Sequence, residues 1–278
     1  MAISETAPAR TPARPFSWRL FGILLALIII GLIGLLPYAL TLQAPMLARV
    51  PLPFSLPVLE LISVIQGTLI YGLLAAIGLL LANRIGLGAP ILEAWLNGEP
   101  VRERLKAIVR PAIITGMLAG VVIIALSVFV FNPLLQAEFA RLGVPLPAVP
   151  NPPAWQGLLA SFYGAFDEEI LLRLFMLTLL AWLGSRVSRS ADRRPTPVVL
   201  WVANILAAVL FGVGHLPTAT AIGLPMTGLL VTQIIVLNGL AGLAFGWLYW
   251  RYGLESAMLA HFSADIVLHV IAPLVLAS

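Results

Sequence analysis

Residues 18–40 read WRLFGILLALIIIGLIGLLPYAL, with Arg19 as their one charged side chain. A run of about 18 or more apolar residues is long enough to cross a bilayer as a helix. This run is too long for the apolar core of a secretory signal peptide, and no small-residue cleavage site follows it. We therefore expect residues 18–40 to form a retained transmembrane helix, and this helix sets the fold class of the chain.

Six further apolar stretches follow, at about residues 57–82, 111–133, 155–183, 198–215, 224–250 and 255–275. The chain is 60% hydrophobic and only 10% charged, with a mean hydropathy of +1.03. A soluble domain carries about 25% charged residues, so this chain lacks the polar surface of a water-soluble globule. The sequence predicts an all-α membrane bundle of about seven transmembrane helices, or eight if Asn238–Gly239 interrupts the sixth.

The basic residues predict the orientation of the bundle, because cytoplasmic loops are enriched in Lys and Arg. With a cytoplasmic N-terminus, most of the 16 basic residues fall on the inner side: Arg10, Arg14, Arg19, Arg84, Arg102, Arg104, Lys106, Arg110, Arg186, Arg189, Arg193, Arg194 and Arg251. The outer loops hold only Arg49 and Arg141. We expect a multi-pass protein of the cell membrane with its N-terminus in the cytoplasm.

Four segments are expected. Residues 1–17 are interpreted as a disordered cytoplasmic segment, 18–131 as N-terminal transmembrane helices, the proline-rich stretch 132–154 as an irregular outer loop, and 155–275 as the catalytic membrane domain. Cysteine is absent, which excludes disulfides, cysteine nucleophiles and thiolate metal sites. The net charge of +4 follows the loops beside the helices and does not predict nucleic-acid binding.

Charged side chains inside an apolar helix are costly, and they are therefore candidates for function. Within the fourth stretch, Glu169 and Arg173 are four residues apart, so on a helix they can form a buried ion pair. Glu168 faces about 100° away and lacks that partner, which suits a general base. The structural reading, in which the pair only stabilises the helix, stays open, and Asp167 faces another side and is a weaker candidate.

Two further groups lie in the last spans. His215 ends the fifth stretch, and His261 stands four residues before Asp265 in the seventh, so both of the latter can reach one point in a bundle. With Glu168, these side chains could bind a divalent metal such as zinc, or polarise a water directly. Each could instead make only structural hydrogen bonds. His269, roughly 12 Å from His261 by helical rise, is expected to be peripheral.

These residues resemble a known family. Glu168-Glu169-x-x-x-Arg173, Phe211-x-x-x-His215 and His261-x-x-x-Asp265 are similar, in that order, to the three motifs of the CAAX-protease and bacteriocin-processing (CPBP, or ABI) family, as in its prokaryotic members. Gly246–Leu254 (GWLYWRYGL), before His261, adds to the resemblance, which covers roughly residues 155–275. The last motif position is commonly Asn in that family and is Asp265 here.

The resemblance implies an intramembrane endopeptidase acting on a protein or peptide substrate at the membrane. In it Glu168 activates a water, while His215, His261 and Asp265 bind a metal or stabilise the oxyanion, and Glu169 and Arg173 support them. The tentative metal ligands are Glu168, His215 and His261, and a metal-free mechanism is the alternative. A proton- or cation-coupled transporter, disfavoured by the lack of an internal repeat, and a non-catalytic scaffold or immunity protein remain rival interpretations.

Overall fold

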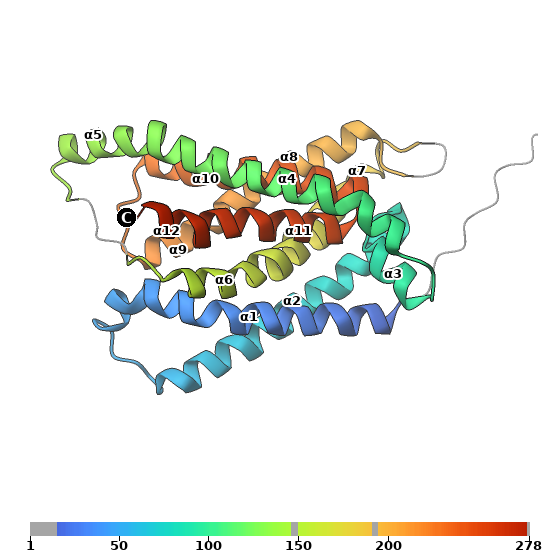
Figure 1. Ribbon diagram of the computed structural model, residues 1–278, viewed down its shortest axis with the longest axis horizontal. Helices are drawn as coiled ribbons and strands as arrows, with labels where there is room; N and C mark the ends of the chain where they lie inside the picture. The colour runs from blue at the N-terminus through green and yellow to red at the C-terminus, as the bar shows by residue number, and fades with distance from the viewer. Residues whose placement is uncertain (1–15, 146–149, 191–193, 277–278) are drawn as a thin grey trace, which may run out of the picture.

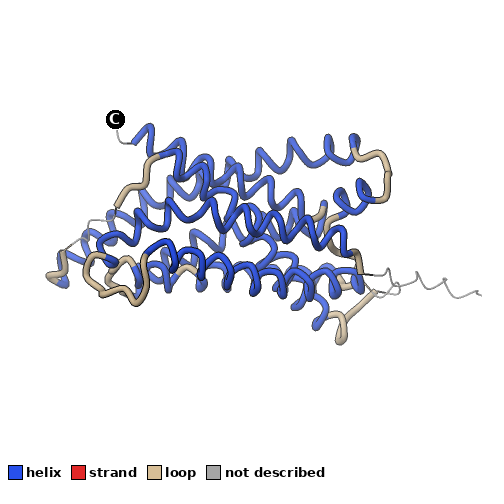
Figure 2. Tube along the Cα trace, turned by 90° about the horizontal axis from the view of Figure 1, so that it is seen from below, coloured by secondary structure: helices blue, strands red, loops and turns tan. Residues whose placement is uncertain are grey.

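The computed structural model describes residues 16–145, 150–190 and 194–276. Nearly all of these residues are helical, and Figure 2 shows the helices as long tubes with the loops gathered at the two ends of the bundle. Within the described ranges no strand forms, and a single isolated bridge pairs Arg189 with Pro195. The predicted all-α membrane bundle is thus confirmed, while the predicted disordered segment 1–17 lies almost wholly outside the described residues.

The elements follow one another along the bundle, as Figure 1 shows. The α-helices, with intervening π-helical turns labelled η, are α1 (Trp18–Leu47), α2 (Leu56–Ile85), α3 (Pro90–Leu96), α4 (Arg102–Leu126), η1 (Ser127–Phe131), α5 (Asn132–Leu142), α6 (Ala154–Tyr163), η2 (Gly164–Glu168), η3 (Ile170–Leu177), α7 (Thr178–Gly184), α8 (Pro197–Gly214), α9 (Leu216–Ala221), α10 (Gly228–Tyr252), α11 (Leu254–Asp265), η4 (Ile266–Ile271) and α12 (Ala272–Leu276).

Among the described residues, six helical stretches are long and apolar enough to cross a membrane. They are Trp18–Leu47, Leu56–Ile85, Arg102–Leu142, Pro197–Ala221, Gly228–Tyr252 and Leu254–Val275. The remaining predicted span is the run from α6 to α7, which is helical but contains Asp167, Glu168, Glu169 and Arg173. Hydropathy alone therefore passes over the one membrane helix that carries the most charge.

One expectation about helix boundaries was wrong, and one alternative is not observed. The outer loop predicted from residue 132 begins only after Leu142, because α4, η1 and α5 form one continuous helical stretch. Pro133 lies just after the π-helical turn η1, and the residues before it, Phe131 and Asn132, keep right-handed helical backbone angles. The possible interruption at Asn238–Gly239 is also absent, since α10 runs through both residues and Asn238 Nδ2 donates to the carbonyl of Ile234.

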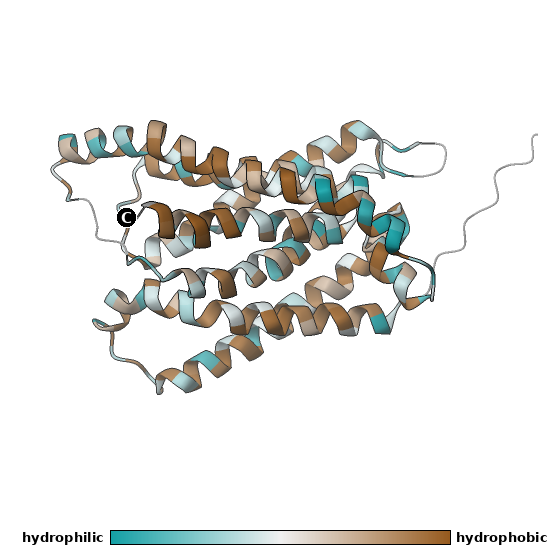
Figure 3. Cartoon of the chain, in the orientation of Figure 1, coloured by the Kyte–Doolittle hydropathy of each residue, from teal (hydrophilic) through white to brown (hydrophobic). Residues whose placement is uncertain are grey.

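One end of the bundle is basic. Arg19, at the start of α1, donates to the carbonyl of Leu96 at the end of α3, and the amide of Leu254 at the start of α11 donates to the carbonyl of Gly88 before α3. Figure 3 shows hydrophilic residues concentrated around α3 and the start of α4, at this end. The basic residues predicted to face inward and described by the structure lie on elements that begin or end here. Their cytoplasmic location stays a prediction.

The far end of the bundle is tied together by uncharged hydrogen bonds and one carboxylate. Thr41 of α1 donates to Gln156 of α6 over 2.8 Å, and Thr227, before α10, donates to Glu138 of α5 over 2.6 Å. Buried polar atoms are costly unless they are paired, so these contacts fix which helices meet at this end. The chain thus runs back and forth between a basic end and a far end, with the apolar core between them.

Close helix contacts depend on glycine in the middle of the bundle. At Gly116 of α4, an added Cβ would overlap the carbonyl oxygen of Ala260 in α11. Small residues at membrane-helix interfaces allow backbones to approach in this way. Because Ala260 directly precedes His261, the α4–α11 contact also sets the position of a candidate site residue.

We predict that Gly116→Ala destabilises the protein, because the new methyl group must push α4 away from α11. Such overpacking costs about 1–3 kcal/mol, which thermal unfolding in detergent would measure. Gly22→Ala in α1 is the matched control, since nothing lies within 4 Å of a Cβ at that position. Equal unfolding temperatures for the two variants would contradict the close contact.

Candidate active site

The two candidate glutamates lie at a change in helix type. Residues Gly164–Glu168 and Ile170–Leu177 form the π-helical turns η2 and η3, with Glu169 between them. A π-turn widens the helix to i→i+5 hydrogen bonds, and such turns are frequent at functional sites. The sequence analysis assumed a regular α-helix and did not foresee them. Glu169 and Arg173 nevertheless meet as expected, with Oε1 and Nη1 3.0 Å apart.

Glu169 is fully enclosed by protein. Its side chain is fully buried, as Arg173 nearly is, and the same Oε1 also accepts from His261 Nδ1 over 2.7 Å. Arg173 uses Nη2 to donate to the carbonyl of Gly242 in α10 over 3.1 Å. One carboxylate oxygen therefore joins the glutamate helix to α11, while the guanidinium joins it to α10.

Aromatic rings surround these charges. The guanidinium of Arg173 lies 5.1 Å from the ring centroid of Phe211 and 5.6 Å from that of Phe245. The ring of His261 lies 4.9 Å from Phe245 and 5.8 Å from Phe211. Cation–π contact with desolvated rings favours the charged guanidinium in this apolar setting. Phe211 was part of a sequence motif, whereas no pattern pointed to Phe245.

The hydrogen bond of His261 decides where its second nitrogen faces. A carboxylate can only accept, so His261 Nδ1 carries the proton shared with Glu169. Its Nε2 then faces Glu168 Oε2 at 3.6 Å and Asp265 Oδ1 at 3.7 Å. These distances exceed a direct hydrogen bond. Nε2 thus lies between two carboxylates, and a proton or a water molecule can bridge the gap to either of them.

His215, like His261, uses Nδ1 for a hydrogen bond and thereby turns Nε2 toward Glu168. It follows the last residue of α8, and its Nδ1 donates to the carbonyl of Phe211 over 2.9 Å. Its Nε2 lies 4.0 Å from Glu168 Oε1. Glu168 therefore faces both histidines, and 18% of its side chain is exposed while none of the Glu169 side chain is. Of the two glutamates, Glu168 is the one whose side chain is not fully enclosed by protein.

His215 lies at the end of α8 and His261 lies within α11, yet both reach Glu168. Two features explain this. The helix of His215 ends at Gly214 and continues as the short α9. In addition, α11 begins next to the start of α3, because Glu255 Oε1 accepts from the amides of Ile91 and Leu92.

The nitrogen and oxygen donors of this cluster are of the type that zinc binds. Zinc ligands lie about 2.0–2.2 Å from the ion, which requires tight convergence. In the part of the chain that the structure describes, no group of three or more His, Asp or Glu side chains is spaced to hold a metal ion. The metal site of Glu168, His215 and His261 that the sequence suggested stays a prediction.

Two more residues lie near the cluster: Gly164, which the sequence analysis did not consider, and Asp167, its weaker candidate. At Gly164, a Cβ would overlap Asp265 Oδ2 and lie 3.0 Å from His261 Nε2, so only glycine leaves room for these groups. Its place four residues before Glu168 was the one available signal. Asp167 is fully buried against Gly31 of α1, and neither of its oxygens has a hydrogen-bond partner. It is not part of the contacts around Glu168.

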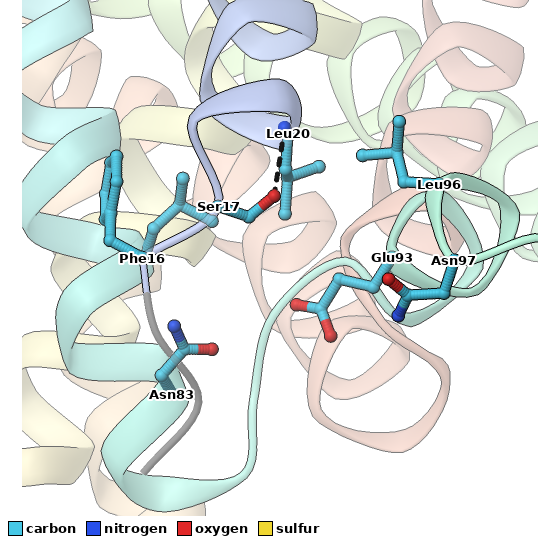
Figure 4. A pocket seen from close by; sticks show the side chains of 8 residues that line it. Phe16, Ser17, Leu20, Asn83, Glu93, Leu96 and Asn97 are labelled. Atoms are coloured by element: carbon cyan, nitrogen blue, oxygen red, sulfur yellow. Dashed lines mark hydrogen bonds between the residues drawn. The ribbon is translucent and has the colours of Figure 1, made fainter.

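A separate cavity of about 370 Å³ lies at the basic end between α1, α2 and α3. Figure 4 shows Ser17, Asn83, Glu93 and Asn97 around it, with Leu20 and Leu96. None of the candidate catalytic residues lines this cavity. This cavity thus does not coincide with the cluster of buried charges.

Comparison with known proteins supports the motif assignment. Residues 150–267 match the model of a family described as Type II CAAX prenyl endopeptidase Rce1-like. No curated protein and no solved structure matches the chain. The matched segment covers less than half of the chain but contains all three motifs, from Glu168 to Asp265. Residues 150–267 are therefore similar to a family of CAAX prenyl endopeptidases, in agreement with the resemblance that the three motifs carry.

Proposed function

We propose that this protein is an intramembrane endopeptidase in which Glu168 activates a water for attack on a peptide carbonyl. The observation that carries the proposal is the position of Glu168. Its carboxylate lies 4.0 Å from His215 Nε2 and 3.6 Å from His261 Nε2, and it is partly exposed between them. The similarity of residues 150–267 to a CAAX endopeptidase family supports peptide hydrolysis as the reaction class.

In the proposed reaction, Glu168 takes a proton from water as the water oxygen bonds to the carbonyl carbon. The proton then passes from Glu168 to the leaving amine nitrogen as the C–N bond breaks. Glu168 thus acts first as a base and then as an acid. His215 and His261 aim Nε2 at the same place, and in their protonated forms they donate to the developing oxyanion.

Glu169 and Arg173 have a supporting role in this proposal. Glu169 holds the His261 ring through Nδ1 and thereby aims Nε2 at Glu168. Arg173 neutralises the charge of Glu169 within the apolar bundle. Asp265 assists from the other side of His261 Nε2, 3.7 Å away.

The substrate is a protein or peptide segment that reaches Glu168 from the bilayer or its surface. The family description makes a C-terminal CAAX sequence the first substrate to test. We infer a cell-membrane location with the N-terminus in the cytoplasm, because the basic residues gather at the end where α1 begins.

Glu168→Gln should abolish peptide cleavage, because the amide cannot accept the proton of water. Removal of a general base costs about 10²–10⁴-fold in rate. The assay is release of fluorescence from quenched peptides ending in a CAAX sequence, with and without a farnesylated cysteine, using protein in liposomes. Glu103→Gln is the matched control, because Glu103 pairs with Lys106 at the surface. Cleavage that persists in Glu168→Gln, or wild-type protein that cleaves neither peptide, would reject the proposal.

A chelator should leave cleavage unchanged, because the described His, Asp and Glu side chains are not spaced to hold a metal ion. The measurement is the cleavage rate before and after dialysis against EDTA and 1,10-phenanthroline, with metal analysis of the same sample. Loss of activity that added zinc restores, together with one zinc per chain, would show that the ligands close around a metal and that the metal-free scheme is wrong.

Arg173→Met should destabilise the protein by about 3–5 kcal/mol, because it leaves the charge of Glu169 buried without its partner. The double variant Glu169→Gln/Arg173→Met should recover part of this loss, since no uncompensated charge remains. Unfolding free energies in detergent micelles compare the two. If the double variant is less stable than Arg173→Met alone, the ion pair is not the reason for the burial of Arg173.

A further inference from the structure

His269 is not used by the proposed reaction, yet it lies beside the cluster. The chain has 3 histidines, and the other two face Glu168. Nε2 of His269 lies 3.8 Å from Asp265 Oδ1, the same oxygen that lies 3.7 Å from His261 Nε2. A single carboxylate oxygen therefore stands between two imidazole rings.

The helix geometry keeps His269 on this face. Asp265 is the last residue of α11, and the π-helical turn η4 begins at Ile266. Four residues exceed one turn of an α-helix but fall short of one π-helical turn. Four residues thus rotate a side chain slightly past a full turn in α11 and slightly short of one in η4. The two rotations offset each other, so that His261, Asp265 and His269 lie on one face.

Tyr38 of α1 holds His269 from the other side. The Tyr38 hydroxyl lies 3.2 Å from His269 Nδ1, and the two rings meet edge to face with centroids 5.4 Å apart. A carboxylate has no proton to give when ionised, so the N–H of a neutral His269 belongs on Nε2, toward Asp265. Nδ1 is then the acceptor, and Tyr38 donates to it. Tyr38 thus orients the His269 ring, and the Nε2–H of His269 points toward Asp265 Oδ1 at 3.8 Å, which is longer than a direct hydrogen bond.

Asp265 needs such a partner more than an asparagine would. An asparagine, common at this position in the family that the sequence resembles, carries its own N–H donors, whereas a carboxylate only accepts. Oδ2 of Asp265 faces the backbone of Gly164, where there is no side chain. The ring nitrogens that face Oδ1 are Nε2 of His261 at 3.7 Å and Nε2 of His269 at 3.8 Å. Both Tyr38 and His269 lie outside residues 150–267, the segment that matches the family.

We propose that His269 is a positioning residue, held by Tyr38 of α1, that fixes the carboxylate of Asp265 beside His261. The inference rests on the proposed protease function for its kinetic consequence, but not for its geometry. It assigns a role at the site to α1, which would otherwise be only a packing element. An N-terminal helix outside the family segment thereby tunes the active site.

A kinetic comparison tests the role in catalysis. His269→Phe keeps a ring but removes the donor, so it should lower kcat by roughly 10- to 100-fold, the scale of a small misplacement in an active site, and leave KM unchanged. His269→Gln keeps an N–H donor and should retain most of the rate. Tyr38→Phe should give a smaller loss of kcat, since it removes only the hydroxyl.

The control and the double variant separate positioning from simple packing. Thr41→Val removes the bond to Gln156 one turn away on α1 and should leave kcat unchanged. If His269 acts only through Asp265, adding His269→Phe to Asp265→Ala should cost no further activity. An equal loss in both backgrounds, or equal kcat for His269→Phe and wild type, would overturn the proposal.

A spectroscopic measurement does not depend on activity. With ¹⁵N-labelled histidine, only three imidazole groups give signals. The geometry requires that a neutral His269 carry its proton on Nε2, and that Tyr38→Phe shift the Nδ1 signal by removing its donor. His269→Gln assigns the signal. A proton on Nδ1, or no response to Tyr38→Phe, rejects the positioning role, whereas absent cleavage with the expected signals rejects only the protease function.

Discussion

The structure depends on one buried carboxylate, that of Glu169, and on the two groups that share its Oε1 atom. Arg173 supplies the compensating charge at 3.0 Å, and His261 supplies a proton at 2.7 Å. Either group alone in an apolar bundle would be costly. Together they connect the glutamate helix to α11 and, through the bond from Arg173 to the carbonyl of Gly242, to α10. The register of three helices is thereby fixed at the depth of the site.

This anchoring leaves Glu168 available for chemistry. Glu168 has no comparable hydrogen bond, faces Nε2 of both His215 and His261, and retains some exposure. Two adjacent glutamates thus have different environments, one enclosed in an ion pair and one partly exposed. Such a division between a structural and a reactive carboxylate is what a general base in a membrane requires.

Departures from regular helix geometry bring the remaining groups together. The π-helical turns η2 and η4 occur where the glutamates and Asp265 stand, and Gly164 leaves space for the Asp265 carboxylate. The glycine contact between Gly116 and the backbone beside His261 holds α11 close to α4. Regular helices packed at ordinary distances would not place the same side chains around one point. The N-terminal helix α1, which lies outside the family segment, closes the group through Tyr38 and His269.

The sequence by itself determined the membrane bundle, most helix positions and the three motifs, because apolar length and charge within apolar runs are local properties. It also paired Glu169 with Arg173, since a spacing of four residues survives the change to a π-turn. It placed a loop at residue 132, where helix continues to Leu142, because a proline does not end a helix when the residues before it keep helical backbone angles. Only the tertiary structure decided that His215 and His261 reach the same carboxylate, because their depths depend on where α8 ends and where α11 begins. The contact of Tyr38 with His269 joins residues far apart in the chain, and no local pattern encodes such a distance.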